Sequence, residues 1–65
     1  MKFWACPKCN LLNHETTLVC PNCGVPLEAF ILMPQNRWLE FPSLERAREW
    51  CKIARNMMGL KFWIK

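Results

Sequence analysis

A chain of 65 residues that is 52% hydrophobic, with four tryptophans and four phenylalanines, is too apolar to be a disordered segment. A chain this short buries only about 60% of its unfolded surface, so it commonly requires a metal or another cross-link to fold. The sequence has no apolar run near the ~20 residues of a membrane helix, and its start lacks a signal-peptide segment. We therefore expect a protein of the cytoplasm, a reducing compartment, with no membrane partner.

The positive charge is concentrated in the second half of the chain. Residues 1–29 carry two Lys and two Glu, whereas residues 30–65 carry seven basic residues and three Glu. The formal net charge of +4 therefore belongs to residues 30–65. Any attraction to an anionic partner is expected in that half.

An apolar lead at residues 1–5 predicts a short strand, and two Cys-x2-Cys motifs follow it. Cys6 and Cys9 form the first motif, Cys20 and Cys23 form the second, and ten residues separate them. Paired motifs at this spacing are typical of one structural Zn²⁺ per chain, held tetrahedrally by four thiolates. Such a site is closed, because it leaves no coordination position for a catalytic water.

Three other chemistries use cysteines in similar arrangements. Two disulfides would suit a secreted miniprotein, but there is no secretory signal and the fifth cysteine, Cys51, would be left over. Redox chemistry of the thioredoxin type needs a motif that opens a helix, whereas Pro7 and Pro21 favour turns. Iron bound as in rubredoxin is the alternative metal. Cys51 is expected as a buried small hydrophobe and His14 as a solvated loop residue.

Six residues satisfy the pattern W-x-C-x2-C-x3-N-x6-C-x2-C: Trp4, Cys6, Cys9, Asn13, Cys20 and Cys23. Over residues 4–24 the chain therefore resembles the small zinc finger of the Ran-binding-protein type, also called the nuclear-protein-localisation finger. The resemblance implies that the tryptophan packs against the metal turn and that the asparagine braces the loops between two short hairpins. The positions at which members bind ubiquitin or single-stranded RNA carry different residues here, so the resemblance implies only the fold. A generic zinc ribbon of the prokaryotic style is the alternative.

Between the motifs, residues 10–15 are predicted as a polar turn and residues 16–19 as a strand. Residues 28–65 are predicted as a ββαβ unit that is not similar to a known family. Its elements are strands at 29–33 and 37–41, a helix at 44–58 between Ser43 and Gly59, and a last strand at 60–65. The predicted fold class is therefore α+β, with a four-cysteine finger or ribbon at 1–27 and the ββαβ unit at 28–65 packed together as one compact domain.

The residue types favour binding over catalysis. The chain has no Asp, a single His and no phosphate-binding loop, so we expect neither an enzyme nor a small-molecule substrate. We predict a small non-enzymatic zinc-binding module that acts as a protein-binding adaptor or inhibitor, or that forms a homodimer through an open sheet edge.

Nucleic-acid binding is the alternative function. Trp63 lies between Lys61 and Lys65 on one side of the last predicted strand, and Trp38 follows Arg37. Exposed rings beside cations suit single-stranded nucleic acid, because bases stack on the rings and cations hold the phosphates. The competing interpretation is that both tryptophans cover a second small core.

Overall fold

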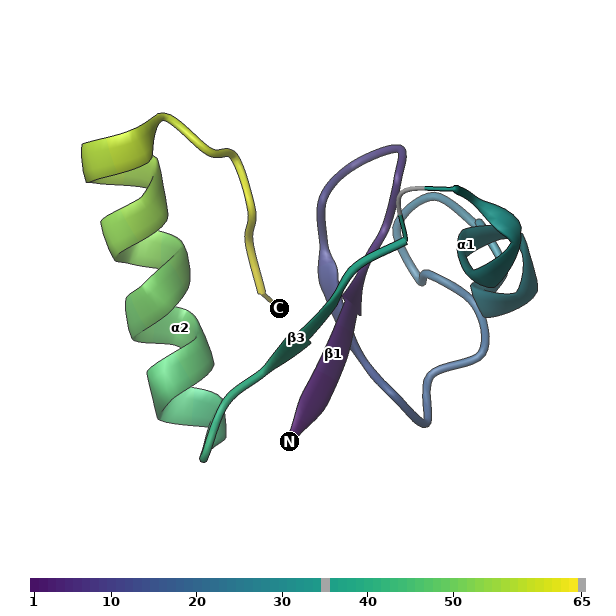
Figure 1. The fold of residues 1–65 in the computed structure, drawn as a ribbon, viewed down its shortest axis with the longest axis horizontal. Helices are drawn as coiled ribbons and strands as arrows, with labels where there is room; N and C mark the ends of the chain where they lie inside the picture. Colours follow the sequence, from purple (N-terminus) through teal and green to yellow (C-terminus); the bar gives the residue numbers. More distant parts are fainter. Residues whose placement is uncertain (35, 65) are drawn as a thin grey trace.

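The structure is a computed structural model that describes residues 1–34 and 36–64. Its elements in chain order are β1 (Lys2–Ala5), β2 (Leu12–His14), α1 (Leu27–Leu32), β3 (Trp38–Glu40), α2 (Leu44–Ile53) and a π-helical turn, η1 (Ala54–Met58). They form three layers, with the sheet between α2 on one side and α1 with the cysteine loops on the other (Figure 1). No helix among the described residues combines the length and the apolar character needed to cross a bilayer.

The sheet is antiparallel, with strand order β2-β1-β3. In the central strand, Phe3 lies opposite His14 of β2 and Leu39 of β3. Since β3 comes from the segment predicted as a separate unit, one sheet contains both predicted segments. The ββαβ unit is therefore not formed as expected, although the α+β class is confirmed.

The alternation of β1 divides the interior into two cores. Successive side chains of a strand point to opposite faces, so Phe3 and Trp4 are buried in different clusters. The cluster on the cysteine side, here the metal-side core, contains Trp4, Cys6, Leu11, Cys20 and Phe30. The cluster below α2, here the helix-side core, contains Phe3, Leu12, Ala47 and Cys51. The predicted burial of Cys51 is thus confirmed.

The strand predicted at residues 29–33 is wrong, because the apolar run forms α1 instead. A short continuous apolar run fits a buried strand and a helix equally well by pattern alone. Pro26 precedes the helix with φ −77°, which suits a helix start, and Glu28 lies in the first turn, where the helix dipole favours an acid. Phe30 is buried in the metal-side core, and Leu27 at the start of α1 is half-buried against it.

The prediction around the cysteine loops is wrong in its positions. The strand lies at Leu12–His14, within the predicted polar turn. Glu15 and Thr16 form a turn, which the Thr17 N–H closes by donating to His14 O. Leu11 and Leu12 are buried in opposite cores, which fixes the register there. Of the predicted strand at 16–19, only Val19 forms a bridge, with Pro26.

The long helix agrees with its prediction at both caps. The Ser43 hydroxyl accepts a hydrogen bond from the Arg46 backbone N–H at 3.4 Å, and Gly59 ends η1 with φ +66°. Trp50 is half-buried and packs against Phe41 and Phe62.

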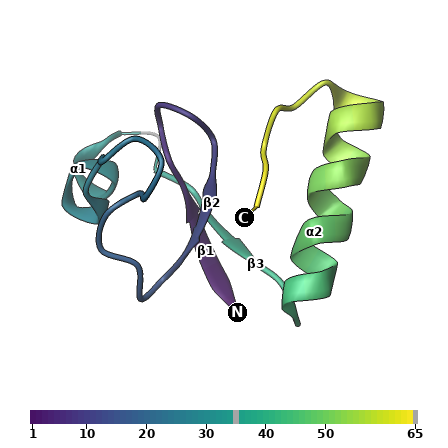
Figure 2. The same ribbon diagram turned by 180° about the vertical axis from the view of Figure 1, so that it is seen from behind.

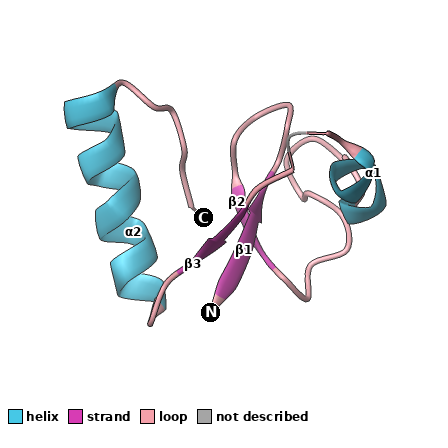
Figure 3. Ribbon diagram, viewed as in Figure 1, coloured by secondary structure: helices cyan, strands magenta, loops and turns pink. Residues whose placement is uncertain are grey.

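The last predicted strand is not formed over residues 60–64, which Figure 3 shows as a loop after η1. Only Trp63 pairs, in a single parallel bridge with Leu11 at the outer edge of β2. Residues 60–64 lie between the sheet and α2 (Figures 1 and 2). Phe62 and Ile64 contact the helix-side core, and Trp63 contacts the metal-side core.

Candidate metal centre

Four cysteine side chains converge on one point. The Sγ atoms of Cys6, Cys9, Cys20 and Cys23 all lie within 4.8 Å of one another, and the Cys9 and Cys20 sulfurs are 3.8 Å apart. Tetrahedral Zn²⁺ with Zn–S distances of about 2.3 Å requires sulfurs about 3.8 Å apart. The four residues are therefore positioned to bind one metal ion, with Zn²⁺ as the fitting choice for four thiolates. All five cysteines of the chain are free.

Two turns with the same backbone hydrogen bonds present these sulfurs. In the first turn, residues 6–11, the Cys6 N–H donates to Leu11 O at 3.0 Å and the Asn10 N–H donates to Cys6 O at 2.8 Å. We call this turn the first knuckle. Asn10 adopts φ +64°, a left-handed conformation that asparagine tolerates better than most residues.

The second knuckle, residues 20–25, repeats this geometry fourteen residues later. The Cys20 N–H donates to Val25 O at 2.9 Å, and the Gly24 N–H donates to Cys20 O at 2.8 Å. Gly24 has φ +76°, as expected for the glycine that follows the second motif. The spacing of the cysteines thus encodes two equivalent turns around one site.

Burial differs between the first and the second cysteine of each knuckle. Cys6 and Cys20 are buried in the metal-side core, whereas Cys9 and Cys23 are half-buried. Trp4 is fully buried beside them, and its indole N–H donates to Thr17 O at 2.9 Å. Asn13 is buried and donates to Leu11 O at 3.2 Å, which fastens the loop after the first knuckle.

The thiols influence one another's ionisation. Burial raises the pKa of Cys6. At Cys9 burial opposes ionisation, but hydrogen bonds from the Asn22 side chain and the Leu11 backbone outweigh it and lower the pKa to about 6. The hydrogen bond that Cys23 shares with Cys9, together with burial and the Cys9 charge, raises the pKa of Cys23 to about 11. One thiolate therefore disfavours the next, and four of them need a cation to coexist.

His14 is not part of this cluster. Its Nδ1 lies 2.8 Å from the Thr16 hydroxyl and accepts the Thr16 backbone N–H at 3.2 Å. These contacts close the turn after β2. The prediction of a solvated loop histidine is therefore wrong, because His14 is the last residue of β2, is half-buried and contacts Phe3 edge-on.

The residues predicted to bind a partner occupy different places. Trp63 is half-buried, packs against the metal-side core and donates its indole N–H to Cys9 O at 2.8 Å. Trp38 is 38% exposed and contacts Phe30 edge-on. Arg37 and Lys61 are exposed, and Lys65 lies outside the described residues.

Trp38 and Trp63 lie at opposite edges of the sheet. Trp63, in residues 60–64, pairs at the outer edge of β2. Trp38 is in β3, which lies on the other side of β1. The position of Trp63 agrees with the competing interpretation that this tryptophan covers a core, although alternation along the predicted strand did not indicate which residues it covers.

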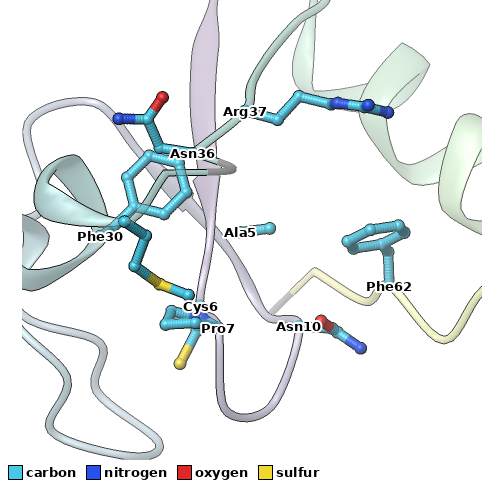
Figure 4. Close-up of a pocket in the computed structure, with 9 residues that line it drawn as sticks. Ala5, Cys6, Pro7, Asn10, Phe30, Asn36, Arg37 and Phe62 are labelled. Atoms are coloured by element: carbon cyan, nitrogen blue, oxygen red, sulfur yellow. The ribbon is translucent and has the colours of Figure 1, made fainter.

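A groove of about 690 Å³ opens beside the end of β1. Figure 4 shows Arg37 and Phe62 on one side of it and Phe30 and Asn36 on the other. Among the described residues that line it, Arg37 is the only charged one, and the Cys6 thiol belongs to the metal centre. The described residues that line the groove therefore include no acid–base pair of the kind that catalysis uses.

Comparisons with protein-family models, with curated proteins and with solved structures found no match. The structure supports the coarser class, a small α+β protein with a four-cysteine metal centre near its N-terminus. The burial of Trp4 and Asn13 agrees with what the resemblance to the Ran-binding-protein type of finger implies. Membership of that family stays a prediction.

Proposed function

We propose that this chain is a non-enzymatic, zinc-stabilised protein-binding module whose partner binds the surface around α1. The observation that carries the proposal is a hollow of about 380 Å³ lined by apolar side chains and by Glu28. We call this surface the α1 patch; it consists of Leu18, Pro26, Leu27, Ile31 and Leu32. Contiguous apolar patches that are exposed to solvent commonly mark sites of protein interaction.

The exposure of the α1 patch is large for a chain of 65 residues. Leu32 is 77% exposed, Leu18 is 70% exposed and Ile31 is 50% exposed. Full burial of a leucine side chain contributes about 1.5–3 kcal/mol of favourable free energy. Folding does not obtain this free energy at the α1 patch, because its leucines stay exposed. A partner that covers the α1 patch would obtain that free energy.

The metal centre supports the patch rather than reacting. The four sulfur atoms would complete a tetrahedral site around Zn²⁺, which would leave no coordination position for a substrate or a water. Val25 and Leu27, on either side of Pro26, pack against the metal-side core. Metal binding therefore holds the start of α1 in place.

Partner capture tests the proposal. The zinc-loaded chain, Ile31→Glu and Leu32→Glu would each be cross-linked in extracts of the source cells, with Met57→Glu as the matched control. Met57 is 80% exposed and lies on η1, at the end of the long helix in the opposite layer (Figure 1). We expect the parent chain and Met57→Glu to recover the same protein, and the two α1 variants to recover about tenfold less. A partner that the α1 variants retain would contradict the proposal.

Nucleic-acid binding is a second candidate, at a different surface from the one predicted. Arg46, Arg48, Lys52 and Arg55 are exposed along α2 and η1. Binding of this kind weakens steeply with salt, about one power of salt concentration for each phosphate neutralised. Titration of a fluorescent single strand at two salt concentrations tests it, since absence of binding at low salt removes this candidate.

A further inference from the structure

The first knuckle already binds an extended segment of its own chain. Trp63 donates its backbone N–H to Asn10 O at 3.2 Å and its indole N–H to Cys9 O at 2.8 Å. The Leu12 N–H donates to Trp63 O at 2.8 Å. Three hydrogen bonds thus hold a tryptophan-containing segment parallel to residues 10–12.

The second knuckle has the same two backbone acceptors, and neither is used by the described residues. Cys23 and Gly24 occupy the positions of Cys9 and Asn10 in the repeated turn. No residue in the described parts of the chain donates a hydrogen bond to the carbonyl of Cys23 or of Gly24. Gly24 is exposed, so a second segment can approach. Pro26 occupies the position of Leu12 and has no N–H, so the third bond has no counterpart.

The α1 patch lies next to these two carbonyl acceptors along the chain. Pro26 is two residues after Gly24 and lines the hollow. A segment parallel to residues 24–26, as residues 62–64 are parallel to residues 10–12, would pass Pro26. If the bound segment has a tryptophan at the position of Trp63, the side chain of its next residue would contact Leu27 and Ile31 in the hollow.

Charge indicates which segments fit. Residues 1–29 have equal numbers of Lys and Glu, so four thiolates and one divalent cation leave this half near −2. Glu28 is the only charged residue that lines the hollow among those described. The segment on the first knuckle has Lys on both sides of residues 62–64 in the sequence. A basic segment is therefore complementary to this half of the protein.

We propose that the second knuckle and the α1 patch together bind an extended segment of a partner protein with a tryptophan, an apolar residue after it and basic flanks. The indole N–H of that tryptophan donates to Cys23 O, and its backbone N–H donates to Gly24 O. The following apolar side chain enters the hollow. This inference rests on the proposed function, because it specifies the partner of the same surface.

The probe is an end-capped hexapeptide, Leu-Lys-Phe-Trp-Ile-Lys, titrated into the isotope-labelled, zinc-loaded full chain and followed by nuclear magnetic resonance. We expect saturable shifts within residues 18–32, while residues 10–12 and the indole signal of Trp63 stay unchanged. A peptide with 1-methyltryptophan lacks only the indole donor, and it should bind about two- to tenfold more weakly. Ile31→Glu and Leu32→Glu should weaken binding about tenfold, and Met57→Glu should not.

Three results would overturn the inference: no saturable binding, equal affinity of the 1-methyltryptophan peptide, or shifts at residues 10–12 with release of Trp63. The last result would mean that the peptide replaces residues 60–64 on the first knuckle. None of them would remove the proposed function if the cell partner is still captured and is still lost in Leu32→Glu. The partner would then bind the α1 patch through other chemistry.

Discussion

The two knuckles of this protein have the same backbone hydrogen bonds and different surroundings. The first knuckle continues into β2, which pairs with β1, and Trp63 covers it from the far end of the chain. The second knuckle continues into Pro26 and α1, and an isolated bridge between Val19 and Pro26 flanks it. One turn is therefore enclosed by the fold, and its counterpart is left accessible.

The comparison separates what determines the conformation of each turn from what determines how the turn is covered. The turn itself depends on local requirements, which are cysteines at fixed spacing and a residue that tolerates positive φ. What covers the turn depends on the rest of the chain, and residues 60–64 reach only one of the two knuckles. The accessible knuckle is where we place function, and the enclosed one contributes stability.

Loss of the metal should have the largest effect and should affect both knuckles equally. Because the two turns share one site, Cys6→Ser and Cys20→Ser should each abolish stoichiometric zinc binding and unfold the metal-side core. Binding free energies of structural zinc, about 10–16 kcal/mol in small peptides, exceed the stability of a domain this small. Native mass spectrometry and circular dichroism measure both effects. Cys51→Ser is the control and should retain zinc, and a folded, metal-free Cys20→Ser protein would contradict the prediction.

Removal of the Trp63 side chain should destabilise the protein at the first, enclosed knuckle. A substitution beside the second, accessible knuckle should have a much smaller effect on stability. Trp63→Ala removes a half-buried ring and the hydrogen bond to Cys9 O, so we expect a loss of about 3 kcal/mol. Trp63→Phe keeps most of the contact and should lose about 1 kcal/mol. Leu18→Ala, at an exposed position near the second knuckle, should change stability by less than about 0.5 kcal/mol. Thermal unfolding of the zinc-loaded proteins measures these effects, and an unchanged melting temperature in Trp63→Ala would contradict them.

The sequence contained enough information for the metal centre and the long helix, because their signals are local. The motif spacing predicts the four ligands, and Ser43 and Gly59 lie at the predicted ends of the helical segment. The run at 27–32 could not be assigned from its pattern, since nearly every position is apolar and a helix and a strand then look alike. Trp63 could not be placed, because its contact with Cys9 spans 54 residues and depends on how the layers meet.

Acid should release the metal. Cys9 and Cys23 hold equivalent positions in the two knuckles, but they should differ in the number of protons that they release when zinc binds. Zinc binds thiolates, so a thiol whose metal-free pKa lies above the working pH releases a proton on binding. In the folded chain at pH 7 Cys23, with its pKa raised to about 11, and Cys6, with its pKa raised by burial, each release one, whereas Cys9, at about 6, releases none. If the metal-side core is unfolded without metal, its thiols have an ordinary pKa of about 8.5, so they are protonated at pH 7 and at least two protons are again released. Affinity should therefore fall by about a hundredfold or more when the pH drops from 8 to 7, since at least two protons compete. Calorimetry in buffers of different ionisation enthalpy counts the protons, and release of fewer than two would contradict this assignment.

The smallest expected effect tests whether the two turns are equivalent in backbone conformation. Asn10 and Gly24 both have positive φ, at +64° and +76°, and a Cβ on Gly24 would have no heavy atom within 4 Å. Gly24→Ala therefore adds only backbone strain and should lose about 1 kcal/mol, because alanine disfavours the left-handed region by about 1–2 kcal/mol. Gly24→Asn should lose less, since the first knuckle already accommodates asparagine at this position. Asn10→Gly should change stability by less than about 1 kcal/mol, because relief of strain and added freedom of the unfolded chain oppose each other. Denaturant unfolding at saturating zinc gives the three values. If Gly24→Ala were as stable as the parent chain, the second turn would not require the left-handed conformation, and its equivalence to the first knuckle would fail.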